Sequence, residues 1–372
     1  MDELLNAYRG CLLGMAIGDA LGFPVDDLSW KAIQTQYGPN GLLGYDLQEQ
    51  EYAQISSYTQ LAAYFCNGLL LSISRRKPDH LQYGKLALRE WTRAQQFYRD
   101  PEPSLCWVAK LSPFRRHHCR DARMLDHLRL GIYSSVNSAK NHSNAPGAIT
   151  AAVSVGLFFN PQRLAPEQIG ILTTELIGLT HGDPEAFLSG AVLAYAIAGI
   201  LQEPSFPLQE QFLQAIAVMD GQFRNRFPQS EDLAAQLRRA ISLAQAGTVS
   251  AQEGMEQLGC TDAAQCLAGA MFACLRYPDD FDSAITTAVN HSGMSAAVGA
   301  ITGAVLGAKG KDFSLPEFYL ESLDCTQPLE LLAEDLLCGS PAAGIFDDSW
   351  DHKYVQGMPP EELTVDDGKP SP

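Results

Sequence analysis

Positive charge is scarce in this 372-residue sequence: 26 lysines and arginines stand against 43 aspartates and glutamates, which gives a formal net charge of −17. A chain with that charge repels the phosphate backbone of nucleic acids, so no nucleic-acid partner is expected. Charged residues make up only 19% of the chain and hydrophobic residues 46%. This composition is typical of a globular protein with a sizeable buried core.

Paired cysteines and the common nucleotide and nucleophile motifs are also absent. The nine cysteines are odd in number, none forms a C-x-x-C pair, and most stand in apolar runs. These features argue against a disulfide framework and a zinc site, and they are typical of reduced thiols in a cytoplasmic protein. There is no G-x-S-x-G, no G-x-x-x-x-G-K-[ST] and no G-x-G-x-x-G, so an acyl-transfer elbow, ATP chemistry and dinucleotide binding have no support.

Long hydrophobic runs are missing as well. The two most apolar stretches, Ala186–Leu201 and Gly293–Ala308, fall short of the roughly 20 residues that a bilayer requires. The first residues include Asp2, Glu3 and Arg9 where a signal peptide would have a basic region and then an uninterrupted apolar core. The sequence therefore predicts a cytoplasmic protein without a membrane span, and buried core helices for both apolar stretches.

The sequence does contain helical periodicity, whereas the alternating pattern of strands is nearly absent. Residues 41–50, GLLGYDLQEQ, are at most a short hairpin fragment. We predict an all-α fold, a single-domain multi-helix bundle over residues 1–338, followed by an acidic, Pro-containing tail over residues 339–372 that is extended or disordered, with Trp350 and Tyr354 as candidate anchors of part of it to the body. The predicted helices are Glu3–Ile17, Thr59–Ser74, Leu81–Arg99, Arg120–Tyr133, Gly147–Phe158, Pro166–Gly178, Pro184–Leu201, Leu208–Asp220, Ser230–Ala246, Asp262–Arg276, Phe281–Val289, Ser295–Lys309 and Leu329–Leu337.

Glycine recurs every four residues in two segments at opposite ends of the chain. The two sets are Gly10, Gly14, Gly18 and Gly22, and Gly299, Gly303 and Gly307. Residues four apart share one face of a helix, and each interior glycine costs roughly 1 kcal/mol relative to alanine. Such a stripe indicates that another backbone or a ligand approaches closely. We expect the two segments to lie side by side, either as closely packed helices or as the walls of a shared cleft.

Four segments, taken in order, resemble the ADP-ribosylglycohydrolase family. They are RGCLLGMAIGDALGFPVDD, ISSYTQLA, LTHGDPEAFLSGAVLAYAIAGIL and AVNHSGMSAAVGAITGAVLGAKG. The first is close to the family's opening G-x-x-x-G-x-A-x-G-D-A-L-G-x-P-x-E, and the third is close to its T-H-x-D-P helix. A weaker match, APGAITAAVSVGLFF, stands where the family has N-G-A-A-M-R-x-A-P-x-G. The resemblance covers residues 8–316 and implies an all-α bundle, in agreement with the helical pattern.

The resemblance also implies two magnesium ions, held by carboxylates and hydroxyls of the second and fourth segments, that act on the ribose hydroxyls and the attacking water. The positions that match the four ligand carboxylates hold Ser57, Tyr58, Met294 and Ala296. Ser56 alone keeps the expected ligand type. Asp26 and Asp19 remain nearby, but they cannot balance two divalent cations about 4 Å apart. We therefore expect no metal and no other cofactor in this chain.

A ligand cleft is expected between four segments: the Gly18–Asp27 turn, the Ser56–Thr59 segment, the loop around Asn144–Gly147 and the Gly293–Ala297 helix start. Small residues leave volume there, and the helix that starts at Ser295 presents unpaired N–H groups that suit a phosphate. The candidate ligand-binding residues are Ser56, Ser57, Tyr58, Asn144, Gly147, Gly293, Met294 and Ser295. Asp26 and Asp19 are the candidate catalytic residues. For Tyr58 two interpretations stay open: its ring stacks on a ligand, or it fills the former metal site.

Two further features have competing interpretations. The basic segment Arg115–Arg123 either contacts a pyrophosphate or an acidic partner, or it is a solvated loop and helix start. His181, in the T-H-x-D-P segment, is expected to form hydrogen bonds at the start of a helix rather than to act as a base.

Three functional hypotheses follow. The chain is a family member that has lost metal-dependent hydrolysis and binds ADP-ribose, a related nucleotide or an ADP-ribosylated protein. Alternatively, it hydrolyses a glycosidic bond without the metal pair or with a single metal, using Asp26 or Asp19 as general base. In the third hypothesis it is a structural or protein-interaction module that keeps only the fold. Whether it is an enzyme stays open at this point.

Overall fold

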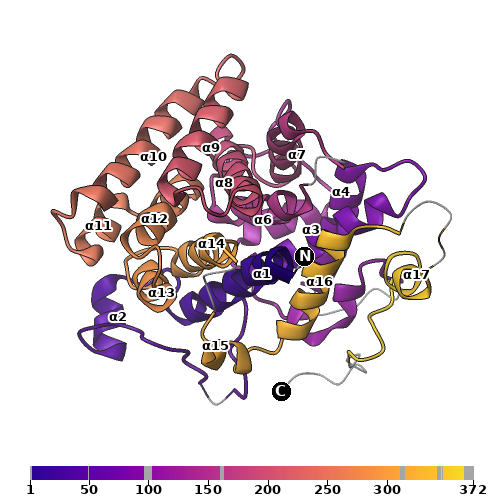
Figure 1. Ribbon diagram of the computed structural model, residues 1–372, viewed down its shortest axis with the longest axis horizontal. Coiled ribbons are helices and arrows are strands. Elements are labelled where there is room, and N and C mark those ends of the chain that lie inside the picture. Colours follow the sequence, from indigo (N-terminus) through magenta and orange to yellow (C-terminus); the bar gives the residue numbers. More distant parts are fainter. Residues whose placement is uncertain are drawn as a thin grey trace.

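The computed structural model describes residues 2–48, 50–95, 103–159, 163–310, 315–341, 345 and 347–363. Over these residues the chain folds into seventeen α-helices and four short 3-10 helices, and its only β-type pairs are two isolated bridges. The predicted all-α fold is confirmed. Figure 1 shows α1 and α14 side by side near the centre of the molecule, with the other helices arranged around them.

The α-helices are α1 (Asp2–Gly22), α2 (Trp30–Tyr37), α3 (Ser57–Ile73), α4 (His80–Ala94), α5 (Ala122–Arg129), α6 (Thr150–Phe158), α7 (Pro166–Gly178), α8 (Pro184–Gln202), α9 (Leu208–Phe223), α10 (Gln229–Ala246), α11 (Ala251–Leu258), α12 (Ala263–Arg276), α13 (Phe281–Val289), α14 (Ser295–Gly307), α15 (Glu317–Glu321), α16 (Thr326–Cys338) and α17 (Asp348–Tyr354). The 3-10 helices are η1 (Phe23–Val25), η2 (Trp107–Lys110), η3 (Ser112–Arg115) and η4 (Pro146–Ile149).

The two glycine stripes meet along α1 and α14. A Cβ atom added at Gly10, Gly14 or Gly18 would lie less than 3.0 Å from the carbonyl oxygen of a glycine on α14, and the same holds in reverse. The partners along the pair are Gly10 with Gly307, Gly14 with Gly303 and Gly18 with Gly299. The expectation that the two ends of the chain lie side by side is confirmed, and the stripes serve backbone-to-backbone packing over most of their length.

α8 is the one helix within the described ranges that is long and apolar enough to cross a membrane. Of the residues in its most apolar stretch, 72% are buried inside the protein. Phe187, Leu193 and Ile197 on this helix are at most 1% exposed. The helix starts as its sequence predicts: the Asp183 carboxylate accepts a hydrogen bond from the N–H of Glu185 at 2.9 Å, and a proline follows at the first helical position. Its apolar surface is therefore used in packing against neighbouring helices.

The C-terminal segment 347–363 packs against the body through the two candidate anchors, Trp350 and Tyr354, and it is not extended or disordered there. Trp350 Nε1 donates a hydrogen bond to Ser74 Oγ at 3.1 Å. The Tyr354 hydroxyl donates to the Asp335 carboxylate at 2.6 Å, and both aromatic side chains are buried. Two aromatic anchors in an otherwise polar segment were enough to fix it to the bundle.

Other differences from the sequence prediction concern short elements. The eight-residue helices α2 and α11 were not predicted, because so short a segment shows barely two turns of periodicity. Residues 41–48 form no strand. By contrast, α7 and α13 begin and end at the predicted residues.

Candidate functional site

Asp19 lies on the last turns of α1 and is fully buried. Its Oδ2 atom accepts hydrogen bonds from the N–H of Ser56 at 3.0 Å, the N–H of Thr59 at 3.0 Å and the Thr59 hydroxyl at 2.6 Å. Its Oδ1 atom is buried without a hydrogen-bond partner. Burial raises the pKa of Asp19 to about 6, against the lowering effect of these hydrogen bonds. The carboxyl group thus holds the start of α3 against α1.

Asp26 follows η1 and is 7% exposed. Its Oδ1 atom accepts a hydrogen bond from the N–H of Ala296 at 3.0 Å, in the first turn of α14. Arg120 Nη1 donates to the main-chain oxygen of Asp26 at 2.8 Å and lies 3.4 Å from its Oδ2 atom. Burial raises the pKa of Asp26 to about 7, while the Ala296 hydrogen bond and the Arg120 charge lower it. The anion position at the α14 N-terminus is therefore taken by the protein's own carboxyl group.

The second family-like segment forms the N-terminus of α3. Ser56 is its N-cap, with Oγ accepting a hydrogen bond from the N–H of Tyr58 at 3.1 Å. Burial, with a smaller effect of the nearby negative charges of Asp26 and Asp19, raises the pKa of Tyr58 well above its usual range. Its hydroxyl stays protonated at neutral pH. Ser57, the position of a family carboxylate, is partly buried at the start of α3.

The fourth family-like segment is held by its backbone. Gly293 pairs with Leu28 in an isolated antiparallel bridge, and its φ of 128° is one that side chains rarely adopt. The N–H of Met294 donates to the main-chain oxygen of Cys260 at 2.8 Å. Ser295 is fully buried, and its Oγ atom has no hydrogen-bond partner. These contacts fix the start of α14 against the segment that carries Asp26.

The predicted cleft is reduced to a cavity of about 10 Å³, roughly the room of one water molecule. Three of the four segments expected to bound it do line it, through Tyr58, Pro146 and Ala297. Asn144 is exposed, and its main-chain oxygen accepts a hydrogen bond from the N–H of Ala263 at 2.8 Å. The structure therefore brings the predicted segments together but leaves little open volume between them.

The residues present do not fit the metal pair that the family uses. Among the residues that the structure describes, no three His, Cys, Asp or Glu side chains gather closely enough to hold a metal ion. The two remaining carboxyl groups, Asp19 and Asp26, are bonded to backbone N–H groups. A hard cation such as magnesium needs several oxygen ligands with carboxylates among them, and this donor set does not supply them.

His181 also reaches this region, although the sequence indicated only a hydrogen-bonding role for it at the start of a helix. Its Nδ1 atom is 2.7 Å from the Thr180 hydroxyl, and its buried Nε2 atom has no partner. A Cβ atom at Gly147 would lie 3.7 Å from that Nε2 atom, so the imidazole adjoins the loop before α6. Burial lowers the pKa of His181 to about 4, and the ring is neutral at neutral pH. In the sequence, the T-H-x-D-P motif was the feature that could have pointed to His181 as a residue of this region.

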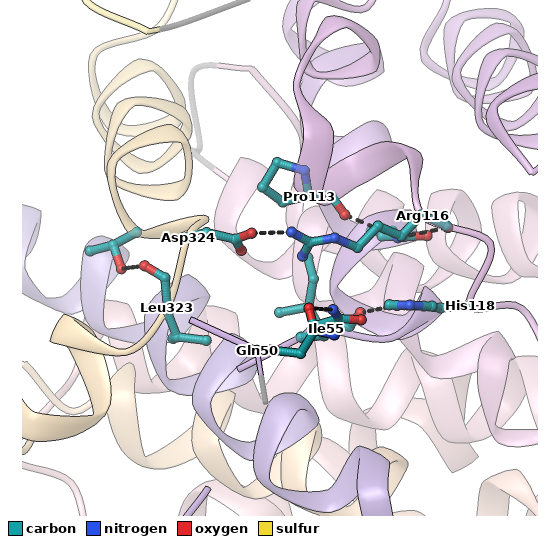
Figure 2. Close-up of polar contacts among 10 residues, drawn as sticks. Gln50, Ile55, Pro113, Arg116, His118, Leu323 and Asp324 are labelled. Atoms are coloured by element: carbon teal, nitrogen blue, oxygen red, sulfur yellow. Dashed lines mark hydrogen bonds and ion pairs between the residues drawn. The ribbon is translucent and has the colours of Figure 1, made fainter. Parts of the chain in front are cut away.

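The basic segment divides into two parts. Arg120 contacts Asp26, as described, and its guanidinium lies 5.1 Å from the centre of the Phe23 ring. Arg116 instead forms an ion pair with Asp324 beside α16 (Figure 2). Only Arg120 among these arginines is thus placed over the candidate site, a distinction that the sequence did not make.

A second, larger cavity opens on the outer side of Asp26. It has a volume of about 280 Å³ and lies between η1, the loop that precedes α3 and Arg120. Its lining is mostly polar and includes Asp46, Gln48, Gln50, Gln54 and Arg120, with Phe23 on one wall. The larger open space at this end of the molecule is therefore separate from the small cavity that Tyr58 lines.

Comparison with known proteins agrees with the all-α fold and with the family-like segments. The sequence is 24% identical over 331 residues, which cover 88% of this chain, to an uncharacterized protein of Archaeoglobus fulgidus, of which they cover 95%. A solved structure described as an ADP-ribosylglycohydrolase-related protein complex has the same fold, with a TM-score of 0.55 and 22% identity over 90% of this chain and 98% of that one. The sequence model of the ADP-ribosylglycohydrolases matches residues 1–343. The chain belongs to the ADP-ribosylglycohydrolase family.

Proposed function

We propose that this chain is a member of the family without metal-dependent hydrolase activity, and that it binds ADP-ribose, a related nucleotide or an ADP-ribosylated protein. The observation that carries the first part is the state of the α14 N-terminus. The Asp26 carboxyl group bonds the N–H of Ala296, and Tyr58 lines a cavity of only about 10 Å³ beside it. The protein's own groups thus stand where the family holds its metal ions.

The proposed ligand binding rests on family membership and on two features at the same end of the molecule, which are buried polar atoms without partners and an open cavity. The buried Nε2 atom of His181 and the Oγ atom of Ser295 have no partners, and each is able to meet a ligand if the site opens. A 280 Å³ cavity next to the site is already open.

Metal-independent hydrolysis is the second candidate, because one observation favours it. Asp26 has a pKa raised to about 7, which suits a general acid or base near neutral pH. In the closed site, however, Asp26 is 7% exposed and its Oδ1 atom is already bonded. Turnover would therefore require the segment that carries Asp26 to move away from α14.

Calorimetric titration with ADP-ribose, with and without magnesium, tests the proposal. We expect binding that does not depend on magnesium and no release of free ADP-ribose from an ADP-ribosylated peptide. Turnover without metal would favour the hydrolase. If neither heat nor a change in melting temperature appears at millimolar ADP-ribose, the ligand-binding function is wrong and the structural alternative takes its place.

Tyr58→Ala decides how the closed cavity relates to binding, with Tyr58→Phe as the matched control that keeps the ring. Because Tyr58 lines the small cavity, we expect the alanine variant to open volume and to bind ADP-ribose as well as the wild type or better. A loss of about 1–3 kcal/mol in binding free energy would instead show that the ring stacks on the ligand. The phenylalanine variant should bind like the wild type in either case.

A further inference from the structure

The open cavity beside Asp26 has walls that are held in place by the rest of the fold. His118 Nδ1 donates to the main-chain oxygen of Ile55 at 2.7 Å, and Gln54 Nε2 donates to Gln50 Oε1 at 3.0 Å. Figure 2 shows the loop that carries His118 lying against Ile55 and Gln50. A bound molecule would therefore meet a largely preformed surface, which lowers the entropic cost of binding.

Behind this surface, the buried side chain of Gln60 ties the same loop to α3. Its Nε2 atom donates to the main-chain oxygens of Pro113 and Arg116, each at 3.1 Å. The loop before α3 is anchored on its other side, where the N–H of Ala53 donates to the main-chain oxygen of Ser322 at 2.8 Å. Both walls of the cavity are thus fixed by hydrogen bonds to other elements.

Arg120 supplies the one cation in the cavity lining. Its Nη1 atom is tethered to the main-chain oxygen of Asp26, and its guanidinium rests on the Phe23 ring, whose centre also lies 4.8 Å from that of His118. Its Nη2 atom donates to the main-chain oxygen of Phe23 at 3.4 Å, and the side chain is nevertheless 53% exposed and lines the cavity. A guanidinium fixed in this way and still exposed suits a phosphate group.

The remaining lining suits hydroxyl groups more than an aromatic base. Gln50 Nε2 and Gln54 Oε1 have free hydrogen-bonding capacity, because only the other atom of each amide is used in their mutual bond. The Asp46 carboxylate accepts from the Tyr37 hydroxyl at 2.6 Å and from Gln48, and it is part of the cavity lining. Amides and a carboxylate of this kind match the donors and acceptors of a sugar.

We infer that this cavity binds a phosphorylated pentose, with the phosphate at Arg120 and the hydroxyls at Gln50, Gln54 and Asp46. The inference rests on the proposed function, since a ribose phosphate is the part of an ADP-ribose-like ligand that has this chemistry. The volume of about 280 Å³ lies just below the roughly 300–1,000 Å³ of sites that enclose a whole drug-sized ligand. The cavity therefore holds this part of such a ligand and leaves the adenine outside it.

Titrations of the full chain with ribose 5-phosphate, ribose and ADP-ribose, by calorimetry and by the phosphorus NMR line width, test the site. Arg120→Met should weaken ribose 5-phosphate about tenfold or more and leave ribose unchanged. Gln54→Leu should weaken all three ligands. Arg123→Met is the matched control, because Arg123 is exposed in the same basic segment and does not line the cavity. It should bind all three ligands like the wild type.

The outcomes separate this inference from the proposed function. If ADP-ribose binds the wild type and both cavity variants equally well, the cavity is not the site, although the proposed function stands. If ribose 5-phosphate binds and the variants weaken it while ADP-ribose does not bind, the cavity site stands and the proposed function fails. Absence of ribose 5-phosphate binding to the wild type overturns the inference. Gln54→Leu leaves Asp26 paired with Arg120, so it keeps the test valid if Arg120→Met is unstable.

Discussion

The two ends of the α1–α14 pair are built on different principles. Along most of their length the helices pack backbone against backbone, with Gly14 facing Gly303 and no space for a Cβ atom on either side. At the site end, side chains make the contact: Asp26, which follows α1 and η1, bonds the start of α14, and Tyr58 lines the small cavity beside it. One end depends on the absence of side chains and the other on their identity.

This difference explains how a family fold persists while its ligand set changes. The contact of Gly10, Gly14 and Gly18 with Gly307, Gly303 and Gly299, called the seam from here on, accepts almost no substitution, because any side chain would separate the helices. A carboxylate cluster without its metal is instead self-repelling, so replacing its members with neutral residues stabilises the fold. Ser57, Tyr58, Met294 and Ala296 stand where such carboxylates are expected from the family pattern. The seam retains the architecture, and the site end is free to close on itself.

The seam should give the largest effect on stability. In Gly14→Val, the new side chain would meet the main chain of Gly303, which cannot move without separating α1 from α14. We expect a loss of about 3 kcal/mol or more in the free energy of unfolding, at the upper end of overpacking effects, or a failure to fold. Urea unfolding and the yield of soluble protein measure this.

The control for this prediction is Gly221→Ala. Gly221 is exposed on α9, and a Cβ atom there would meet nothing within 4 Å. Alanine at this position should raise stability by about 0.5–1 kcal/mol, because it limits the freedom of the unfolded chain. Equal unfolding midpoints for Gly14→Val and the wild type would contradict the account of the seam.

Much of the fold was predictable because its signals are local or periodic. The four-residue glycine spacing predicted the seam, and the cap formed by Asp183 and Pro184 predicted the start of α8. The short helices α2 and α11 lack enough turns for a period to show. The packing of α17 depends on Trp350 meeting Ser74, a contact between distant segments that periodicity does not report.

The candidate site was predictable as a set of segments and not as a geometry. Family-like motifs correctly brought the start of α3 near the start of α14, and the missing carboxylates pointed away from a metal pair. The hydrogen bond from Ala296 to Asp26 could not be predicted, since it depends on the path of the chain after η1. The selection of Arg120 over Arg116 depends in the same way on tertiary contacts.

Stability should depend on pH at the end of the α1–α14 pair that carries Asp26, unlike at the glycine contact. The expected change in unfolding free energy is smaller than that of Gly14→Val and larger than that of magnesium. The pKa of Asp26 is raised to about 7 in the folded protein and is about 3.9 in an unfolded chain. The folded state thus holds a proton that the unfolded state has lost, and the contribution of Asp26 to stability falls as pH rises from about 4 to about 7. Asp26→Asn removes this dependence and keeps an oxygen that can accept from Ala296.

Urea unfolding of both proteins across this pH range measures the effect. Relative to the wild type, Asp26→Asn should gain about 1 kcal/mol or more between the acid and neutral ends. Asp19, whose pKa is raised to about 6, titrates in both proteins, and its direct contribution largely cancels in the difference. Arg120 and Asp27 also act on the Asp26 charge and are unchanged in the variant. Parallel stability curves would show that Asp26 does not hold the extra proton.

Magnesium should have the smallest effect, and it tests whether the site end has truly left the family's chemistry. Two divalent cations about 4 Å apart need several carboxylates to offset their repulsion, whereas Asp26 and Asp19 are both bonded to backbone N–H groups. Millimolar magnesium should therefore leave the melting temperature unchanged relative to sodium chloride of equal ionic strength. Crystals grown with magnesium should show no pair of octahedral ions near Tyr58 and Ala296. A stabilisation specific to magnesium that is lost in Asp26→Asn would place an ion on that carboxyl group and contradict the prediction, because the carboxyl could then no longer be regarded as a fixed part of the α1–α14 contact.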